Sequence, residues 1–440
     1  MKNVGELNLD YLCLGCGSCE VACPVAAVEI KLKNNVYLPE VDNIKCIECD
    51  KCLNVCPGTS ISLEGYADTL FAADNSGNKD EVLGRYLSNY LAYAADQKLR
   101  YEAASGGLAT SILIYLLEEG IIEGAVVTKM SEEDKRKSKT FIAQSAEEIK
   151  AAKNSKYCST HPLSALKELR NFESDAKFAF VGLPCHIQGL RKLQQQEKWL
   201  RKKIIFSIGL LCTHSVDYSG TEVILDKLAS GSKNIKKLEY RGSGWPGKAS
   251  IEYEDHSSSI PLYDYWSPYF ASYFFTPYRC LSCSDLVGEL ADISLGDAWL
   301  KEIEAEDDLG TSIIISRTKF AEKIIREMKV NGIIAAEKIS KDKIKESQKK
   351  IIMRKKHTIA YRLSLFKIFS KEVPDYGKAY DLSDQSIFQK FKGYLGAFLL
   401  WFNSYLSKKE IGIKIIKFIP RSILKKYSSL VNKAAGRKYE

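Results

Sequence analysis

The spacing of apolar residues predicts alternating helices and strands between residues 101 and 330. Residues 105–119 begin with a capping serine and two glycines and continue at helical spacing. Residues 160–172 and 186–195 also show helical spacing. Five short apolar runs are typical of buried strands: 125–128, 177–182, 204–211, 292–295 and 311–316. This alternation predicts an α/β domain with a largely parallel sheet. Pieces of strand broken by Gly and Pro around 236–253 predict an antiparallel insertion, so we expect a mixed sheet overall.

The last hundred residues have a different pattern. They contain 24 Lys and Arg against 8 Asp and Glu, whereas the rest of the chain contains 40 against 47. Within them, residues 387–406 place six apolar side chains on one helical face: Phe388, Phe391, Leu395, Phe398, Phe402 and Tyr405. We expect a basic, largely helical C-terminal extension. It packs on the protein itself, contacts the inner face of a membrane peripherally, or docks an acidic redox partner. Nucleic acid is not expected, because no recognition module accompanies the charge.

The location of the protein bears on its thirteen cysteines. Residues 1–10 are polar and lack the apolar stretch of a secretion signal. No apolar run approaches the roughly 20 residues that a membrane-spanning helix needs. We therefore expect a cytoplasmic protein, in which clustered cysteines bind metal more often than they form disulfides.

Eight of the cysteines form two runs with the same spacing, and a proline follows the fourth cysteine of each run. In bacterial ferredoxins this spacing lets three thiolates bind one 4Fe–4S cluster while the fourth reaches the other cluster. The first cluster would use Cys13, Cys16, Cys19 and Cys56. The second would use Cys46, Cys49, Cys52 and Cys23. Zinc is the alternative, but the repeated three-plus-one pattern followed by proline is far less typical of zinc sites. We expect an α+β ferredoxin-like dicluster domain that conducts electrons.

Four of the other five cysteines have positions that permit a further site. Cys185 and Cys212 each follow a predicted strand, where doubly wound sheets place ligands. Cys280 and Cys283 form a pair at ligand spacing. Together they make a plausible four-thiolate site, although Cys185 or Cys212 alone would more often be a buried apolar thiol. Cys158 is expected to be a free cysteine in the core.

Residues Ser105, Gly106 and Gly107 open a predicted helix with almost no side chains. The free amides of such a helix start can hold a phosphate or pyrophosphate. Glycine pairs at helix starts are common, so this motif alone does not establish a ligand.

Together these motifs resemble the beta-subunit family of coenzyme F420 hydrogenases and dehydrogenases. The resemblance covers roughly residues 1–330 and includes the ferredoxin module. Three segments carry it: 182–191 (Gly-Leu-Pro-Cys-His-Ile-Gln-Gly-Leu-Arg), 241–247 (Arg-Gly-Ser-Gly-Trp-Pro-Gly) and 291–299 (Ala-Asp-Ile-Ser-Leu-Gly-Asp-Ala-Trp). Two features depart from the family: His186 stands where Gln is more usual, and the extension beyond about residue 340 has no counterpart.

The resemblance implies a non-covalent FAD and a third 4Fe–4S cluster. That cluster would be bound by Cys185, Cys212, Cys280 and Cys283. The flavin would be contacted by Ser105, Gly106, Gly107 and Thr110, by the loop Asn154, Ser155, Lys156 and Tyr157, and by Gly182 and Pro184. Near the flavin face or the substrate would lie Trp245, Pro246, Gly247 and Lys248. The catalytic candidates are His186 and Lys248. His214 is also a candidate proton donor, but both histidines could instead serve the local structure. Asp292 and Asp297 would either hold the local backbone, which is the more conservative interpretation, or hydrogen-bond the flavin.

The predicted function is that of an iron–sulfur flavoprotein oxidoreductase. Electrons would enter from ferredoxin or another redox protein and leave on a small organic substrate, in a setting such as polysaccharide biosynthesis, to which some bacterial members of the family are linked. Two alternatives stay open: an electron-transfer subunit without its own substrate, and a coenzyme F420-dependent oxidoreductase. The expected division of the chain is 1–63 (ferredoxin domain), 64–100 (linker), 101–340 (FAD and 4Fe–4S oxidoreductase domain) and 341–440 (extension).

Overall fold

The N-terminal module folds as a small α+β unit. The computed structural model describes residues 2–74, 78–228 and 234–436. The antiparallel strands β1 (Val28–Lys33) and β2 (Val36–Val41) form a hairpin. Three short helices accompany it: α1 (Leu9–Leu12), α2 (Ser18–Ala22) and α3 (Lys51–Asn54). Buried Val4, Leu12 and Val28 pack with cysteines of both runs, so the cysteine loops themselves form part of the core of this module.

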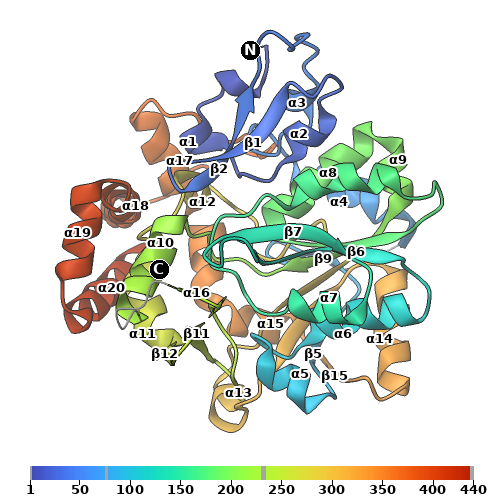
Figure 1. Ribbon diagram of the computed structural model, residues 1–440. Coiled ribbons are helices and arrows are strands. Elements are labelled where there is room, and N and C mark those ends of the chain that lie inside the picture. The colour runs from blue at the N-terminus through green and yellow to red at the C-terminus, as the bar shows by residue number, and fades with distance from the viewer. Residues whose placement is uncertain (1, 75–77, 229–233, 437–440) are drawn as a thin grey trace.

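The larger domain is built on an eight-stranded mixed sheet with the order β15-β5-β14-β13-β9-β8-β6-β7 (Figure 1). Its strands are β5 (Ser88–Ala94), β6 (Gly124–Met130), β7 (Ser138–Ala143), β8 (Phe178–Gly182), β9 (Ile204–Leu210), β13 (Ile293–Asp297), β14 (Ser312–Ser316) and β15 (Ile334–Ile339). The neighbouring strands β6, β8, β9 and β13 are parallel, and the outer pairings are antiparallel. The prediction of a mixed sheet is confirmed. The expectation that the sheet is largely parallel is wrong, because short connections such as the one between β6 and β7 form antiparallel pairs.

Helices cover both faces of this sheet. Alternate residues of β8 point to opposite faces, so Phe178 and Phe180 pack on one side and Ala179 on the other. The first side is covered by α8 (Pro184–Gln196) and the 3₁₀ helix η3 (Pro162–Asn171). The second side is covered by α6 (Leu108–Glu118) and α14 (Lys319–Val330) (Figure 1). Because the sheet is buried on both faces, its strands are continuous apolar runs, and this is why the sequence revealed them.

The segment 64–100 does not form a linker. Its second half supplies β5, which lies between β14 and β15 within the large sheet. The tyrosine-rich sequence of 84–94 mixes polar and apolar residues and contains no continuous apolar run, so the strand was not recognised. Its neighbour β15 is itself half exposed. The remaining elements of the domain are α4 (Leu63–Leu70), β3 (Asn78–Asp80), β4 (Gly84–Tyr86), α5 (Gln97–Glu102), α7 (Ala146–Ala151), α9 (Lys198–Lys203), α10 (Tyr218–Leu228) and α13 (Lys301–Glu306).

The predicted antiparallel insertion is a separate three-stranded sheet. It consists of β10 (Lys237–Glu239), β11 (Lys248–Glu252) and β12 (Ser257–Pro261). The chain then passes through α11 (Leu262–Tyr265), a π-helical turn η4 (Trp266–Phe270) and α12 (Tyr278–Leu281). Aromatic side chains of this segment, including Tyr265, Tyr269 and Phe270, are fully buried. They form a third core beside the large sheet.

The C-terminal extension is helical, as expected. It contains α15 (Lys341–Ser347), α16 (Lys349–Ile352), a π-helical turn η5 (Met353–His357), α17 (Ile359–Ile368), α18 (Ile387–Ser407), α19 (Glu410–Phe418) and α20 (Arg421–Ala435). Figure 1 shows α18, α19 and α20 grouped on one side of the molecule, next to the N-terminal module and α12. Among the described residues, no helix combines the length and the apolar character needed to cross a bilayer.

Candidate functional site

The first cysteine run lies against Cys56, which comes from the second run. Burial raises the pKa of Cys13, and the nearby thiols of Cys56 and Cys16 raise it further. Cys16 and Cys19 are also buried, and Cys56 contributes to their raised pKa values. The N–H of Gly15 donates to Cys13 Sγ over 3.3 Å. Thiolates that repel one another in this way need a positively charged partner, and bound metal deprotonates such thiols outright.

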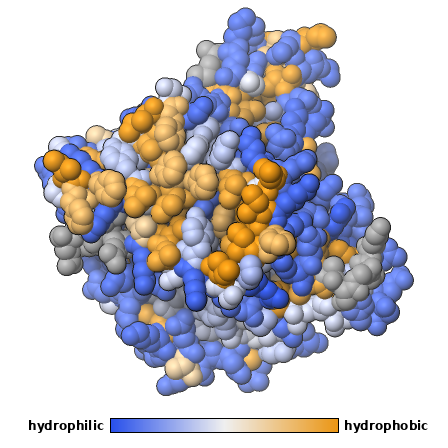
Figure 2. Space-filling model, turned by 90° about the vertical axis from the view of Figure 1, so that its left-hand side faces the viewer, coloured by the Kyte–Doolittle hydropathy of each residue, from blue (hydrophilic) through white to orange (hydrophobic). Residues whose placement is uncertain are grey.

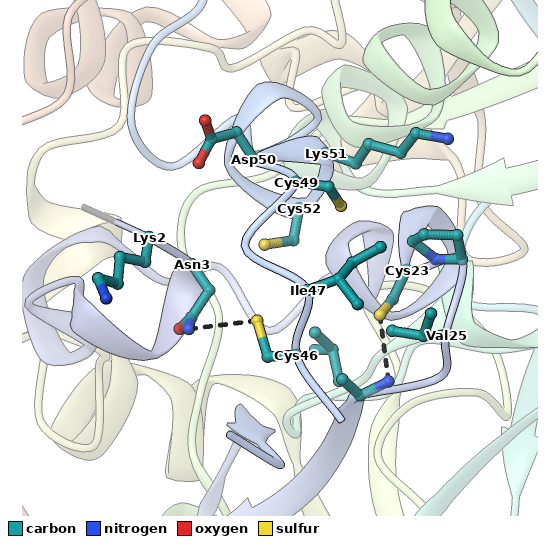
Figure 3. Close-up of a pocket in the computed structure, with 13 residues that line it drawn as sticks. Lys2, Asn3, Cys23, Val25, Cys46, Ile47, Cys49, Asp50, Lys51 and Cys52 are labelled. Carbon is teal, nitrogen blue, oxygen red and sulfur yellow. Dashed lines mark hydrogen bonds between the residues drawn. The ribbon is translucent and has the colours of Figure 1, made fainter. Parts of the chain in front are cut away.

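The other four cysteines of the module line a small pocket that opens partly to solvent. Figure 3 shows Cys23, Cys46, Cys49 and Cys52 around this space. The amide of Ala27 donates to Cys23 Sγ over 3.1 Å, and Cys49 is exposed at the surface. Thus Cys23 lies with the second run and Cys56 with the first. The crossover required by the predicted ligand sets is compatible with the fold, and the ligand sets themselves stay a prediction.

The ferredoxin module docks tightly on the larger domain. At Gly189 in α8 a Cβ atom would lie 3.4 Å from Cys16 Sγ, and at Gly17 a Cβ would lie 2.5 Å from Ser164 Oγ. The Lys192 ammonium, also on α8, donates to the carbonyl oxygens of Cys56 and Ser60 over 3.0 and 2.9 Å. The small residues allow the backbones to approach, and the lysine joins the two domains.

The four later cysteines meet at the edge of the large sheet where β8 and β9 end. Cys185 follows β8, Cys212 follows β9, and Cys280 and Cys283 come from α12 and the turn after it. Burial raises the pKa of Cys185, and Cys212, Cys283, Cys280 and Cys16 each add to the shift. Burial also raises the pKa of Cys212; Lys355 lowers it, and Cys280 and Cys283 raise it further. The contribution of Cys16 to Cys185 places this third set next to the first cysteine run.

The C-terminal extension covers the third set with basic residues. Lys355 in η5 is buried, and its ammonium donates to Cys283 Sγ over 3.3 Å and to the carbonyl of Asp285 over 2.8 Å. Burial disfavours the charge of Lys355, but the thiolates of Cys283, Cys212 and Cys280 hold its pKa above the usual range. Arg279 lies beside the set and donates to Tyr376 Oη over 3.1 Å. No sequence pattern singles out Lys355, which is one basic residue in a run of four.

Within the described part of the chain, no three His, Cys, Asp or Glu side chains group closely enough to hold a single metal ion. The case for iron–sulfur clusters therefore rests on the spacing of the cysteines, on amide donors to their sulfur atoms, and on the comparisons below. Cys158, the one cysteine outside these three sets, is free and buried among Tyr218 and Tyr240. Burial raises its pKa to about 11, so it is a core thiol, as predicted.

The Ser105-Gly106-Gly107 turn is packed against the start of β14. Ser105 and Ser312 share a hydrogen bond of 2.8 Å, and the N–H of Gly106 donates to Ser312 Oγ over 3.0 Å. A Cβ at Gly106 would lie 2.8 Å from the carbonyl oxygen of Ala92. Gly107 is the N-cap of α6 in a left-handed conformation and offers no side-chain cap. The first glycine is required by packing, while the amides at the start of α6 stay available to a ligand. Thr110 is buried in the first turn of α6.

The loop 154–157 packs against the segment around Gly242. A Cβ at Gly242 would lie 3.1 Å from the side chain of Asn154, whose buried Oδ1 accepts no hydrogen bond among the described residues. The Lys156 ammonium is not free for a ligand, because it donates to the carbonyls of Lys153 and Asn154 over 2.7 and 2.9 Å. Burial lowers its pKa to about 7. Tyr157 packs on Trp266 with ring centroids 4.8 Å apart.

His186 caps its own helix. The N–H of Leu183 donates to its Nδ1 over 3.2 Å, next to Pro184 in the first turn of α8. Burial lowers the pKa of His186 to about 3, so the ring is neutral near pH 7. His214, also buried, stacks near Tyr273 with centroids 4.3 Å apart and likewise has its pKa lowered by burial to about 3. Among the described residues, neither ring nitrogen of His214 has a hydrogen-bond partner. The catalytic assignment of His186 and the proton-donor assignment of His214 both stay predictions. Lys248 is exposed at the start of β11.

A buried ion pair joins 241–247 and 291–299, two of the three signature segments that carry the family resemblance. The Arg241 guanidinium donates to both oxygens of Asp297 over 2.8 Å, and Trp245 Nε1 donates to the same carboxylate over 2.8 Å. Burial opposes the charge of Arg241, but Asp297 holds its pKa above the usual range. A similar pair links Arg191 and Asp292 over 3.0 Å. These aspartates hold the backbone around the site, which was the more conservative of the two interpretations.

Three family models match the chain. Residues 12–61 match a 4Fe-4S dicluster domain. Residues 89–167 and 175–342 match the N-terminal and C-terminal parts of the beta subunit of coenzyme F420 hydrogenase/dehydrogenase. The second of these models begins within β5, which agrees with the place of that strand in the sheet. The models end at residue 342, so the C-terminal extension lies outside them.

Similar proteins include archaeal oxidoreductase subunits. Coenzyme F420 hydrogenase subunit beta from Methanothermobacter thermautotrophicus is 30% identical over 287 residues, which are 62% of this chain and 97% of that protein. Coenzyme F420-dependent sulfite reductase from Methanocaldococcus jannaschii is 25% identical over 371 residues, 80% of this chain and 52% of that protein. A chain of the F420-reducing NiFe hydrogenase complex from Methanosarcina barkeri superimposes with a TM-score of 0.54 at 26% identity, and covers 68% of this chain and 100% of its own. The chain therefore belongs to the coenzyme F420 hydrogenase/dehydrogenase beta-subunit family and carries a 4Fe–4S dicluster domain at its N-terminus.

Proposed function

We propose that the chain is an iron–sulfur flavoprotein oxidoreductase, with two 4Fe–4S clusters in the N-terminal module, a third at Cys185, Cys212, Cys280 and Cys283, and FAD beside it. One observation carries the proposal. Four cysteines that are distant in sequence meet at one edge of the sheet, and they do so next to Cys16 of the dicluster module. A pure structural role would not require four thiols at one place beside a buried lysine, since uncompensated thiolates repel one another.

The cofactors would supply the redox chemistry, in which iron–sulfur clusters carry single electrons and a flavin exchanges them for a hydride equivalent. The protein determines where each group binds and how accessible it is. Cys49 is exposed, and Ile44 and Ile47 beside it are 99% and 59% exposed. This edge of the module suits contact with ferredoxin or a similar redox protein. The third set is covered by the extension, so electrons would enter through the module.

Two features of the residues predicted to contact FAD fit this cofactor, and one does not. The amides at the start of α6 lack a side-chain cap, and Asn154 Oδ1 is a buried acceptor without a donor. Both would find partners in a phosphate or in a ring N–H. Lys156 does not fit a phosphate contact, because its ammonium is engaged by the carbonyls that follow α7. We therefore assign the flavin to the start of α6 and the loop at Asn154, with Gly182 and Pro184 at its border.

Coenzyme F420 is the second candidate partner, because the names of the similar hydrogenase and sulfite reductase include it. A small organic substrate in polysaccharide biosynthesis stays a prediction from the resemblance. An electron-transfer subunit without its own substrate is the third alternative. The exposed Lys248 and the buried Trp245 lie on the segment 245–248, where either hydride acceptor would be contacted.

Cofactor content tests the proposal directly. Protein purified without oxygen should contain roughly twelve iron atoms and an equal amount of sulfide per chain, as three 4Fe–4S clusters require, together with one FAD. Roughly eight iron atoms and no flavin would contradict the proposal and favour the electron-transfer subunit. The purified protein is then reduced by ferredoxin and mixed with F420. Reduction of the added F420 would identify this deazaflavin as the hydride acceptor, and no reduction would favour another acceptor.

Replacement of Lys355 tests the role of the extension at the third set. A fixed positive charge beside a cluster stabilises the reduced, more negative state, so Lys355→Met should lower the reduction potential of one of the three clusters. A shift of about 60 mV is expected, which corresponds to tenfold in the one-electron equilibrium. Potentiometric titration followed by electron paramagnetic resonance measures it. Lys350→Met, at an exposed position of the same segment, should leave all potentials unchanged. Equal shifts in both variants would contradict the role of Lys355.

A further inference from the structure

Helix α18 contacts the protein through its small and polar residues. Its buried face consists of Gly393, Gly396, Ala397, Leu400, Asn403, Ser404 and Ser407. The Asn403 amide donates to the carbonyl of Ser272 over 2.8 Å, and Ser407 Oγ accepts from the N–H of Phe275 over 2.7 Å. A Cβ at Gly393 would overlap the ring of Tyr361. This face is therefore fitted to the protein at short range, and the orientation of the helix is fixed.

The opposite face of α18 is aromatic and exposed, which reverses the usual arrangement of a surface helix. Phe388 and Phe391 are 64% and 66% exposed. The exposed apolar residues continue along the helix and onto α19 and α20: Leu395, Phe398, Phe402, Tyr405, Ile411, Ile415, Phe418, Ile423 and Leu430. We call this set the apolar stripe. Figure 2 shows a continuous hydrophobic surface on the side of the molecule that carries these helices. A contiguous exposed patch of this kind marks an interaction site.

The segment that carries the apolar stripe is strongly basic, although Asp226 and Asp264 of neighbouring elements pair with Lys417 and Lys425. Residues 387–435 contain nine lysines and one arginine but only one acidic residue, Glu410. Several lysines lie beside the aromatic rings: Lys392 Nζ is 3.7 Å from the centroid of Phe388, and Lys409 Nζ is 5.3 Å from that of Tyr405. Apolar rings flanked by lysine ammonium groups are the arrangement of helices that lie in the interface of an anionic bilayer.

The positive charge of this segment disfavours a protein partner or a second copy of this chain on the apolar stripe. A second copy of this chain would place two strongly positive surfaces against each other. The cores of protein–protein interfaces are enriched in Arg and aromatic residues but depleted of Lys, whereas here lysine outnumbers arginine nine to one. A lipid surface has no such requirement, because lysines extend to the headgroups while their stems cover apolar atoms.

We propose that α18, α19 and α20 bind the surface of an anionic lipid bilayer. The apolar stripe enters the boundary between headgroups and acyl chains, and the lysines contact the anionic headgroups. Helix α18 has 21 residues and is about 30 Å long, so it lies along the surface. The proposal does not depend on which cofactors or substrates the protein uses. The small-residue face keeps the protein attached to these helices, so binding brings the whole molecule to the membrane.

Vesicle flotation tests the proposal with the full-length protein. We expect binding to vesicles of phosphatidylcholine mixed with phosphatidylglycerol and little binding to phosphatidylcholine alone. Raising the salt from 0.1 to 0.5 M should weaken the binding, because the headgroup potential is screened. Absence of binding to the anionic vesicles at 0.1 M salt would overturn the proposal, and so would equal binding to the two kinds of vesicle.

Two variants separate the apolar and the ionic contributions. The triple change Phe388→Ser, Phe391→Ser and Phe418→Ser should lower the partition coefficient at least about 100-fold. The triple change Lys409→Gln, Lys414→Gln and Lys426→Gln should lower it roughly 100-fold. These side chains are exposed, so thermal unfolding should stay at the wild-type temperature and show that the variants are folded.

A matched control comes from α14 on another side of the molecule. Arg326→Gln, Lys329→Gln and Val330→Ser change two exposed charges and one exposed apolar residue there and should leave binding unchanged. If the α14 variant lost binding as strongly as the stripe variants, the surface would be wrongly assigned. Light scattering completes the test: a dimer that the phenylalanine variant disperses would assign the stripe to a second copy and overturn the lipid proposal.

Discussion

Replacement of Cys212 by alanine is expected to remove about four of roughly twelve iron atoms per chain. It should also abolish reduction of the bound flavin by ferredoxin, while the two clusters of the N-terminal module are still reduced. The reason is the position of Cys212 at the end of β9, where it is surrounded by Cys185, Cys280 and Cys283. With three thiolates left, the site lacks one of the four protein ligands that such a cluster takes. Iron and sulfide analysis and stopped-flow absorbance measure the two effects.

Cys158 provides the matched control, because it is the one cysteine that lies outside the three sets. Cys158→Ala should keep roughly twelve iron atoms, since this thiol is buried in an apolar and tyrosine-rich core. Equal loss of iron from both variants would mean that either change simply destabilises the fold. Full iron content in Cys212→Ala would refute the third cluster.

Replacement of Asp297 by alanine is expected to lower the free energy of unfolding by about 3–5 kcal/mol. Asp297 accepts two hydrogen bonds from Arg241 and one from Trp245, each 2.8 Å long. The Arg241 side chain is 3% exposed, so removal of the carboxylate leaves a buried charge without its partner. Chemical denaturation without oxygen, followed by circular dichroism, measures the loss.

An exposed pair close by in the sequence shows what an ordinary ion pair contributes. Glu302→Ala breaks the pair with Lys343, whose side chains are 47% and 43% exposed, and should cost less than about 1 kcal/mol. The charge-neutral Asp297→Asn should be milder than Asp297→Ala, because the amide oxygen still accepts from Trp245. If Asp297→Ala lowered turnover but left stability unchanged, Asp297 would have a role in the chemistry rather than in the structure.

The cysteine runs were the most informative feature of the sequence, and the reason is chemical. A cluster fixes the spacing of its thiolates, so Cys13 to Cys56 identified the dicluster domain without knowledge of the fold. The long signature segments likewise identified the family. The apolar runs of β8, β9 and β14 were recognisable because those strands are buried on both faces.

Other elements could not be predicted because their environment decides them. Strand β5 has a mixed, tyrosine-rich sequence and was assigned to a linker, yet it pairs with β14 and β15 in the large sheet. Lys156 was expected to contact the flavin, but in the fold its ammonium donates to the carbonyls of Lys153 and Asn154, which follow α7. Lys355 gave no signal at all, because only packing of the extension brings it to Cys283.

The sequence by itself determined the N-terminal dicluster domain, the family and the presence of an amphipathic helix at 387–406. The tertiary structure decided what that helix does with its apolar face. A pattern of spacing identifies a face, but it contains no information on which face is buried. The glycines and serines of α18 allow closer approach to the protein than the aromatic rings would, so the polar side packs inward. In the same way, only the fold brings Cys185, Cys212, Cys280 and Cys283 close together, and a cluster at these cysteines stays a prediction.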